Sequence, residues 1–396
     1  MNSSSKKPEL RPLNASDVVV GEPLSLSVHD AEGHLLLAKG SMIRTPSQRQ
    51  RLLSRDLFVY NLAVDSAAAV KPAAEGQEQR PRRVREINVF DWLDQHVAQL
   101  TKIYDDLSKT PLPETAAGLR RMSIELQRLA DLHHDGLLGA VYLNPKRHSY
   151  AHTKALHVAL LVNELARAQG MSKETRWSLI AAGLTHDVGM WQMQNDIQHR
   201  EAPLSDEQWQ QIRGHCESGI RMLRQAGVTD PVWLTAIEQH HERLNGKGYP
   251  HGLEESKITK QAKILAIADV FAAMVRTRGD REKRMPKDAM REIFMGRGED
   301  IDSTLVQLFI KKLGMFPPGC MLRLVTGEVG IATGPGINAA SPDVEVLVDR
   351  FGNPLARPLY RDTTSKECAV KEFVNAVPHP ELRSLLPGLW KMLPAA

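Results

Sequence analysis

Four separate segments of this 396-residue chain carry imidazole and carboxylate side chains within or beside apolar helical patterns. The residues are His186, Asp187, His215, His240, His241 and Asp269. Helical bundles commonly gather such side chains in their interior, and mixed nitrogen and oxygen ligands suit iron, manganese or zinc better than calcium or magnesium. The pattern therefore predicts a site for one or two divalent metal ions where several helices cross.

Asp269 is the most informative of these residues because it lies in KILAIADVFAAMV, a segment that is apolar nearly all round. Such a segment predicts a buried helix, and an isolated carboxylate is costly to bury unless it is paired or bound to a metal. A helix cap, or an ion pair with a neighbouring arginine, is the alternative to a metal ligand. Asp187 is the natural candidate to bridge two ions, which at about 3.5–4 Å apart would clamp a phosphodiester for in-line attack.

The order of these residues resembles that of a known family. An H-D pair, a histidine, the segment HHERLNGKGYPHGL and the aspartate of I-A-D-V-F follow one another as in the HD-GYP family, a branch of the HD-domain metal phosphohydrolases. The resemblance covers about residues 120–314. It implies a bacterial signalling protein that hydrolyses cyclic di-GMP to pGpG and then GMP, using a centre of two or three metal ions, usually iron or manganese.

The resemblance also assigns roles to individual residues. It implies that all six residues named above are metal ligands, that His240 and His241 hold the second metal, and that Asp187 belongs to the catalytic centre. Tyr249 is a candidate substrate contact. Arg278 and Arg281 are candidate phosphate contacts because arginine suits phosphate, although both could equally be solvated.

The loop NGKGYPHG has a physical role that can be read from its residue types. Gly246 and Gly248 allow positive φ angles, and Pro250 stiffens the turn, so the loop is expected to fix the two histidines and to present Tyr249 at the mouth of the site. By resemblance the same loop docks diguanylate-cyclase domains of the GGDEF type. The alternative is that the loop is only a tight connection.

This sequence departs from the family pattern at the first histidine ligand, where it has Lys154. On a helix His152 would point elsewhere, whereas His157 shares the face one turn along and could substitute only if the metal or the helix shifted. A protonated lysine cannot bind a metal, but it could neutralise Asp187 and Asp269 in place of one metal charge. Lys154 is therefore a second candidate catalytic residue beside Asp187.

A second departure is Met190, which stands where the family has a lysine that contacts the substrate phosphate. Methionine offers neither a charge nor a hydrogen-bond donor. Two functions follow. The first is a metal-dependent cyclic di-GMP phosphodiesterase, with activity that these departures would reduce. The second is a catalytically degenerate domain that binds a nucleotide or a partner protein, and a hydrolase of another nucleotide phosphate is a third, weaker possibility.

The elements around the candidate site divide the chain into parts. Strand and turn patterns over residues 17–61 predict a small β-rich module over residues 1–62, followed by a linker over 63–85. Residues 86–314 are helical in pattern, with the HD-GYP-like core at about 120–314, and residues 315–396 return to strand and turn patterns. We therefore expect a mainly α protein, an HD-type helical bundle flanked by small β-rich modules.

Composition argues against several other classes of protein. The formal net charge of +4 is small and scattered, so no nucleic acid partner is expected. The three cysteines, Cys216, Cys320 and Cys368, form no C-x-x-C pair, which argues against a disulfide framework or a thiolate zinc site. The sequence shows no secretory leader and no apolar run long enough for a membrane span, so we expect a cytoplasmic protein with no membrane partner.

Overall fold

The structure is a computed structural model that describes residues 10–29, 35–37, 39, 43, 49, 52–53, 57–60, 86–197, 203–276, 285–296, 300–374, 380–390 and 393–394. The chain forms two compact units, residues 1–85 and 86–396. The predicted linker, residues 63–85, lies outside the described residues.

The first unit contains a small antiparallel sheet in the order β1-β4-β2-β3. Its strands are β1 (Leu10–Pro12), β2 (Val28–His29), β3 (Leu35–Leu37) and β4 (Phe58–Tyr60), and a 3-10 turn, η1, covers Ala15–Asp17. The alternating pattern of residues 17–30 predicts a longer strand, but in the described part of this segment the regular strand is limited to Val28 and His29. Gly21, with φ of 87°, turns the chain within that segment and interrupts the alternating pattern.

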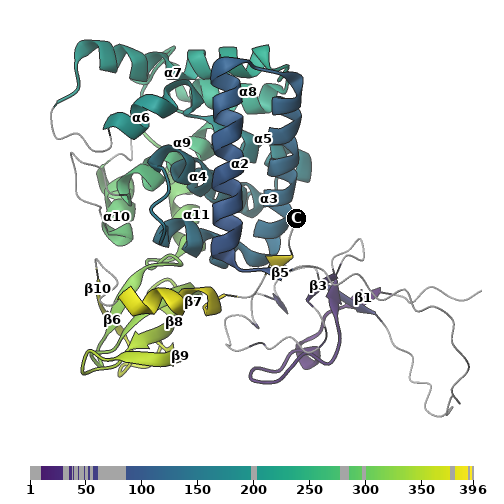
Figure 1. The fold of residues 1–396 in the computed structure, drawn as a ribbon, viewed down its shortest axis with the longest axis vertical. Coiled ribbons are helices and arrows are strands. Elements are labelled where there is room, and N and C mark those ends of the chain that lie inside the picture. The colour runs from purple at the N-terminus through teal and green to yellow at the C-terminus, as the bar shows by residue number, and fades with distance from the viewer. Residues whose placement is uncertain are drawn as a thin grey trace, which may run out of the picture. The chain divides into compact units, whose positions relative to one another are not determined.

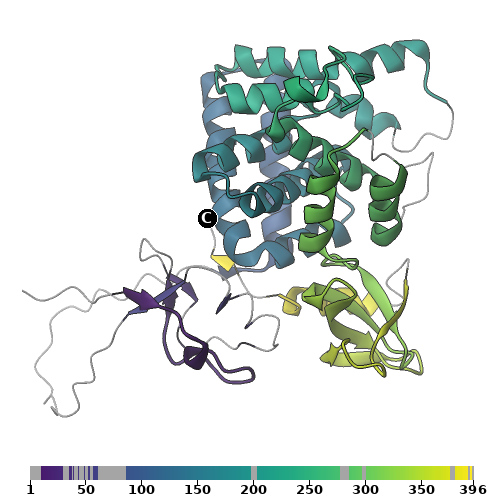
Figure 2. The same ribbon diagram turned by 180° about the vertical axis from the view of Figure 1, so that it is seen from behind.

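The second unit is built on a bundle of helices (Figures 1 and 2). In chain order they are α2 (Val89–Lys109), α3 (Pro113–Leu143), α4 (Tyr150–Ala168), α5 (Lys173–Thr185), α6 (Trp191–Ile197), α7 (Asp206–Gln225), α8 (Pro231–Gln239), α9 (Lys260–Met274), α10 (Pro286–Gly296) and α11 (Ser303–Leu313). The long blue helix α2 faces the viewer in Figure 1, and the later helices, in green, face the viewer in Figure 2. The mainly α class is confirmed.

Local sequence signals define the ends of these helices. Ser205 and Gln208 form a capping box at the start of α7, in which the side chain of each residue accepts a hydrogen bond from the backbone N–H of the other. Gly227, with φ of 85°, follows the end of the same helix, where a glycine commonly stops a helix. Helix α4 is the central element, since every residue from Tyr150 to Ala166 is buried.

The C-terminal part of the second unit is an antiparallel sheet in the order β10-β6-β7-β8-β9. Its strands are β6 (Met321–Leu324), β7 (Val329–Asn338), β8 (Ser341–Val348), β9 (Pro354–Asp362) and β10 (Val370–Phe373). The short turns η4 (Pro380–Ser384) and η5 (Leu386–Gly388) follow, and β11 (Leu393–Pro394) pairs with β5 (Glu86–Ile87). Residues of this sheet and of both turns share one apolar core with the helices. The predicted boundary at residue 314 stays a prediction.

Among the described residues, no helix is both long enough and apolar enough to cross a bilayer.

Candidate metal centre

The H-D pair lies at the junction between α5 and a 3-10 turn, η2 (Val188–Met190). His186 caps the end of α5 and Asp187 precedes η2. Gly189 allows this turn to press against α7, because a Cβ there would lie 2.2 Å from the carbonyl oxygen of His215 and 2.7 Å from the amide nitrogen of Gly219. This close approach brings the α5–η2 junction, with Asp187, next to His215.

The buried carboxylate of Glu242, just after α8, holds the loop that follows through hydrogen bonds to the loop backbone. Glu242 accepts hydrogen bonds from the backbone N–H groups of His251 at 2.7 Å and Leu253 at 2.9 Å. Gly246 adopts a positive φ of 72°, whereas Gly248 does not use the positive φ that its residue type allows. Gly248 is required for another reason, since a Cβ there would lie 2.4 Å from the Cα of Glu242.

This loop also places Tyr249 over the histidine pair. The Tyr249 ring stacks on His241 with a centroid distance of 4.6 Å and an interplanar angle of 26°. Burial, followed by the nearby Cys216 and the two carboxylates of the site, raises the pKa of Tyr249, so its phenol stays protonated at neutral pH. Tyr249 therefore covers one side of the candidate centre and can donate a hydrogen bond.

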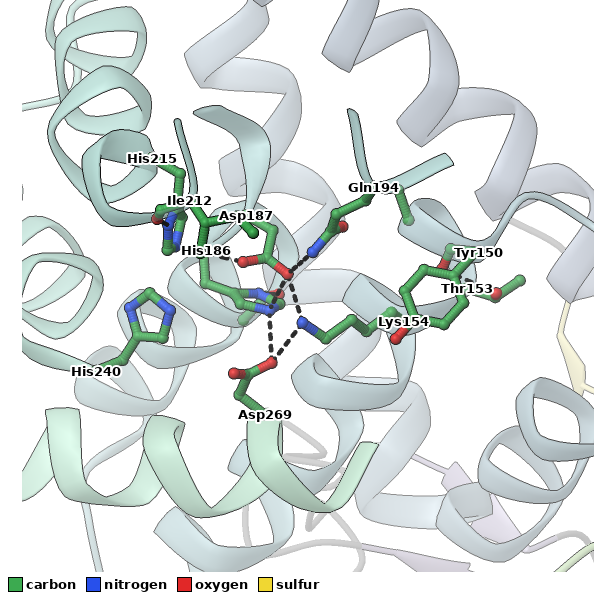
Figure 3. A network of polar contacts seen from close by, with 12 residues as sticks. Tyr150, Thr153, Lys154, His186, Asp187, Gln194, Ile212, His215, His240 and Asp269 are labelled. Carbon is green, nitrogen blue, oxygen red and sulfur yellow. Dashed lines mark hydrogen bonds and ion pairs between the residues drawn. The ribbon is translucent and has the colours of Figure 1, made fainter. Parts of the chain in front are cut away.

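The structure brings all six predicted ligands together, and Figure 3 labels five of them: His186, Asp187, His215, His240 and Asp269. Their donor atoms form two groups that share Asp187, and within each group the atoms lie within 4.8 Å of one another. The first group is Asp187, His215, His240 and His241, and the second is His186, Asp187 and Asp269.

Backbone contacts orient three of the imidazoles. The Nδ1 atoms of His186, His215 and His240 lie 2.8, 2.5 and 2.7 Å from the carbonyl oxygens of Gly183, Ile212 and Ile237. Because a carbonyl only accepts, each Nδ1 carries the proton and donates it. Each Nε2 is thereby left for the interior of the site, the arrangement found when a second contact orients a histidine ligand.

Three buried atoms of the first group have no hydrogen-bond partner among the described residues. They are Asp187 Oδ1, His240 Nε2 and His241 Nε2. Burial and the neighbouring imidazoles lower the pKa of His241 to about 3 and that of His240 far below its usual value. Burial also lowers the pKa of His215. Neutral imidazoles and one carboxylate are the donor set that a divalent transition metal requires, so these residues fit a metal ion.

The second group is occupied by protein cations instead. Lys154 Nζ lies 2.5 Å from Asp187 Oδ2 and 2.6 Å from Asp269 Oδ1, as the dashed lines of Figure 3 show. His186 Nε2 lies 3.0 and 3.2 Å from the same two oxygens. Burial works against charge on Lys154 and His186, but the carboxylates more than offset it, raising the pKa of Lys154 and bringing that of His186 to about 9.

Residues 138–305 match the family model of the HD domain. A cyclic di-GMP phosphodiesterase of Pseudomonas aeruginosa is 29% identical over 74% of this chain and 72% of its own length. A 3'3'-cGAMP-specific phosphodiesterase of Vibrio cholerae is 27% identical over 56% of this chain and 49% of its own. A cyclic di-GMP phosphodiesterase of Thermotoga maritima is 30% identical over 43% and 46%, so this chain spans about half the length of these last two relatives.

The matched segment is thus similar to HD domains, and the relatives support the HD-GYP type. The segment departs from the family pattern in ways that the structure locates. His152 packs against the rings of Tyr104 and Trp191, and His157 packs near the rings of Tyr142 and Phe271. Neither belongs to the two groups of candidate ligands. Met190 is half-buried at the end of η2.

Sequence reasoning missed one residue of this HD domain. Gln194 of α6 is buried and donates a hydrogen bond from Nε2 to Asp187 Oδ2 at 2.5 Å. A glutamine is not a metal ligand by type, so its place in WQMQND gave no signal. Arg278 and Arg281, the predicted phosphate contacts, lie outside the described residues.

A groove of about 630 Å³, its open mouth included, runs from the histidine pair of the HD domain along α9 to the start of α11. It is lined by Gln239, His240, His241, Glu242, Arg243, Leu244, Tyr249, Ile258, Ala262, Lys263, Ala266, Val270, Asp300, Ile301 and Asp302. The walls combine aliphatic side chains and Tyr249 with five charged side chains and the two histidines.

Proposed function

We propose that this HD domain binds cyclic di-GMP at the His/Asp centre and hydrolyses it to pGpG and then GMP. The observation that carries the proposal is the set of three buried atoms without hydrogen-bond partners among the described residues, Asp187 Oδ1, His240 Nε2 and His241 Nε2. The two histidines of this set also line one end of a groove. The names of the relatives support a cyclic dinucleotide as the ligand.

In this proposal the centre holds iron or manganese, because imidazole and carboxylate donors together suit these ions. When bound, such an ion supplies a Lewis acid for a phosphoryl oxygen and lowers the pKa of a water molecule. His215, His240, His241 and Asp187 hold the ion. Lys154, held as an ammonium by two carboxylates, adds positive charge beside the scissile phosphodiester.

The chain would position the substrate through residues around the groove. The protonated phenol of Tyr249 stands over His241 and can donate to a phosphate oxygen, while Arg278 and Arg281 are proposed as further phosphate contacts. The exposed groups of the loop, Arg243, Asn245 and Lys247, support a docking role towards a GGDEF-type cyclase domain. Lys247→Glu should weaken capture of such a domain in a pull-down with purified proteins.

The second candidate function is a domain that binds the nucleotide without turning it over. It is favoured by Met190, whose thioether replaces the lysine expected next to the H-D turn and supplies no charge for the phosphate. Binding and turnover therefore have to be measured separately.

The test loads the full chain with Fe²⁺ or Mn²⁺ without oxygen, measures cyclic di-GMP binding by calorimetry, and follows pGpG and GMP by chromatography. Ala266 faces the groove, so Ala266→Trp should fill it and raise the Kd at least tenfold. Lys260→Trp, at an exposed position of the same helix, is the matched control and should leave the Kd unchanged. Binding with product formation supports the phosphodiesterase, binding alone supports the second candidate, and no binding contradicts both.

A further inference from the structure

We propose that Lys154 permanently takes the place of one metal ion, so that this centre holds a single ion, bound by Asp187, His215, His240 and His241. The inference deepens the proposed function and rests on its metal centre. It starts from the two donor groups that share Asp187, because a bridging carboxylate needs one oxygen free for each ion.

The two oxygens of Asp187 have different surroundings. Oδ2 has three donors around it: Lys154 Nζ at 2.5 Å, Gln194 Nε2 at 2.5 Å and His186 Nε2 at 3.0 Å. Oδ1 has no hydrogen bond and lies 3.4 Å from His215 Nε2. Only Oδ1 is therefore available to an ion, and it belongs to the group that contains the unbonded nitrogens of His240 and His241.

The ammonium of Lys154 leaves no room for an ion in the second group. It bridges Asp187 and Asp269 at 2.5 and 2.6 Å, the oxygens that an ion there would have to approach to about 2.0–2.2 Å. A divalent ion at that place would meet a fixed positive charge at contact distance, in a site where all three side chains are less than a tenth exposed. Repulsion between such charges is strong where water is excluded.

Lys154 cannot swing away to admit the ion. It belongs to α4, on which every residue from Tyr150 to Ala166 is buried, and its own side chain is 6% exposed. If the ammonium moved away, two buried carboxylates would lose their counter-charge, and leaving buried charges unpaired is strongly destabilising. The ammonium is therefore a built-in part of the centre rather than a group that exchanges with metal.

This arrangement changes what the centre can do. An ammonium carries one positive charge and no empty orbital, so it attracts a phosphate but neither binds a water molecule as a metal does nor lowers its pKa to the same extent. Ligand binding at the remaining ion is retained, while chemistry that needs a pair of ions is slowed.

The test counts ions rather than turnover. The full chain is stripped with a chelator, saturated with Mn²⁺ and analysed by mass spectrometry and electron paramagnetic resonance. We expect one ion per chain with the spectrum of an isolated Mn²⁺. Lys154→His should raise the metal content from one to two Mn²⁺ ions per chain. The spectrum should then be that of two exchange-coupled ions, since Asp187 would bridge them. Lys260→His, at an exposed position of α9 that does not line the groove, is the control and should leave the metal content at one ion per chain.

Two coupled ions in the unaltered chain, or no bound ion at all, would overturn the proposal, and both results come from the wild-type protein even if Lys154→His does not fold. A Lys154→His protein that folds and still binds one ion would overturn it as well. The outcome is separable from that of the proposed function: one ion with no cyclic di-GMP binding would leave this inference standing and remove the substrate assignment.

Discussion

At the scale of single residues, the two oxygens of Asp187 differ in their hydrogen bonds, and this difference decides which of them is available to a metal ion. Gln194 matters here because its amide holds Oδ2 and thereby fixes the direction in which Oδ1 points. Groups that orient a metal ligand from behind commonly contribute tenfold to hundredfold to metal affinity. A side chain that never touches the ion can therefore decide how tightly it is held.

Gln194→Ala should accordingly weaken Mn²⁺ binding by about tenfold or more, because Asp187 loses one of the donors that restrain it. The measurement is a calorimetric titration of the metal-free chain. Gln192→Ala, at an exposed position of the same short helix, is the control and should bind Mn²⁺ as the wild type does. Equal affinities in the two variants would show that Gln194 does not position Asp187.

The six candidate ligands could be named from the sequence because their types and order are distinctive, and the structure brings their donor atoms together. Their role as ligands is still a prediction. The contact of Lys154 with Asp187 and Asp269 was also expected, since a buried lysine requires carboxylates. Gln194 could not be found in this way, because only the three-dimensional path of α6 brings an otherwise ordinary amide to the site.

At the scale of elements, the close contact between η2 and α7 places Asp187 beside His215. The sequence pattern predicted that residues 86–314 are helical, and the structure shows that α7 begins at a capping box formed by Ser205. It could not predict that Gly189 lies against the backbone of α7, because that contact depends on the packing of two elements. Over residues 17–30 the same reasoning overestimated a strand, since alternation was counted across the turn at Gly21.

Gly189→Ala should push η2 away from α7, because its Cβ would lie 2.2 Å from a backbone oxygen that cannot rotate aside. We expect a loss of about 1–3 kcal/mol in the free energy of unfolding, the usual cost of overpacking, together with weaker Mn²⁺ binding. Urea unfolding and metal titration measure the two effects.

Gly214→Ala provides the control for this change. Gly214 lies on α7 with open space around its Cβ position, so alanine should stabilise the helix by up to about 1 kcal/mol and leave metal binding unchanged. If Gly189→Ala behaves like Gly214→Ala, the contact between η2 and α7 does not position the H-D pair.

At the scale of the whole second unit, the segment after the C-terminal sheet returns to the helices. Leu382 and Leu386 enter the helical core, and the Trp390 ring covers a groove on α3 that Gly136 and Gly139 create. A Cβ on Gly139 would lie 2.4 Å from that ring. The indole N–H also donates to the carbonyl oxygen of Thr333 in β7 at 2.9 Å, so one side chain joins the helices and the sheet.

Trp390→Ala should therefore lower the stability of the helices that hold the metal centre, although Trp390 belongs to the C-terminal part of the chain. Truncating a buried tryptophan costs about 3–5 kcal/mol, and we expect about 2–3 kcal/mol here because the ring is only partly buried. Trp209→Ala is the matched control, since Trp209 is 46% exposed on α7, and it should change the free energy of unfolding by less than about 0.5 kcal/mol. Urea unfolding should be followed both by circular dichroism, which reports the helices, and by near-ultraviolet signals. If Trp390→Ala shifts neither transition, the sheet and the helices fold independently, and the helical part alone would suffice for the metal centre.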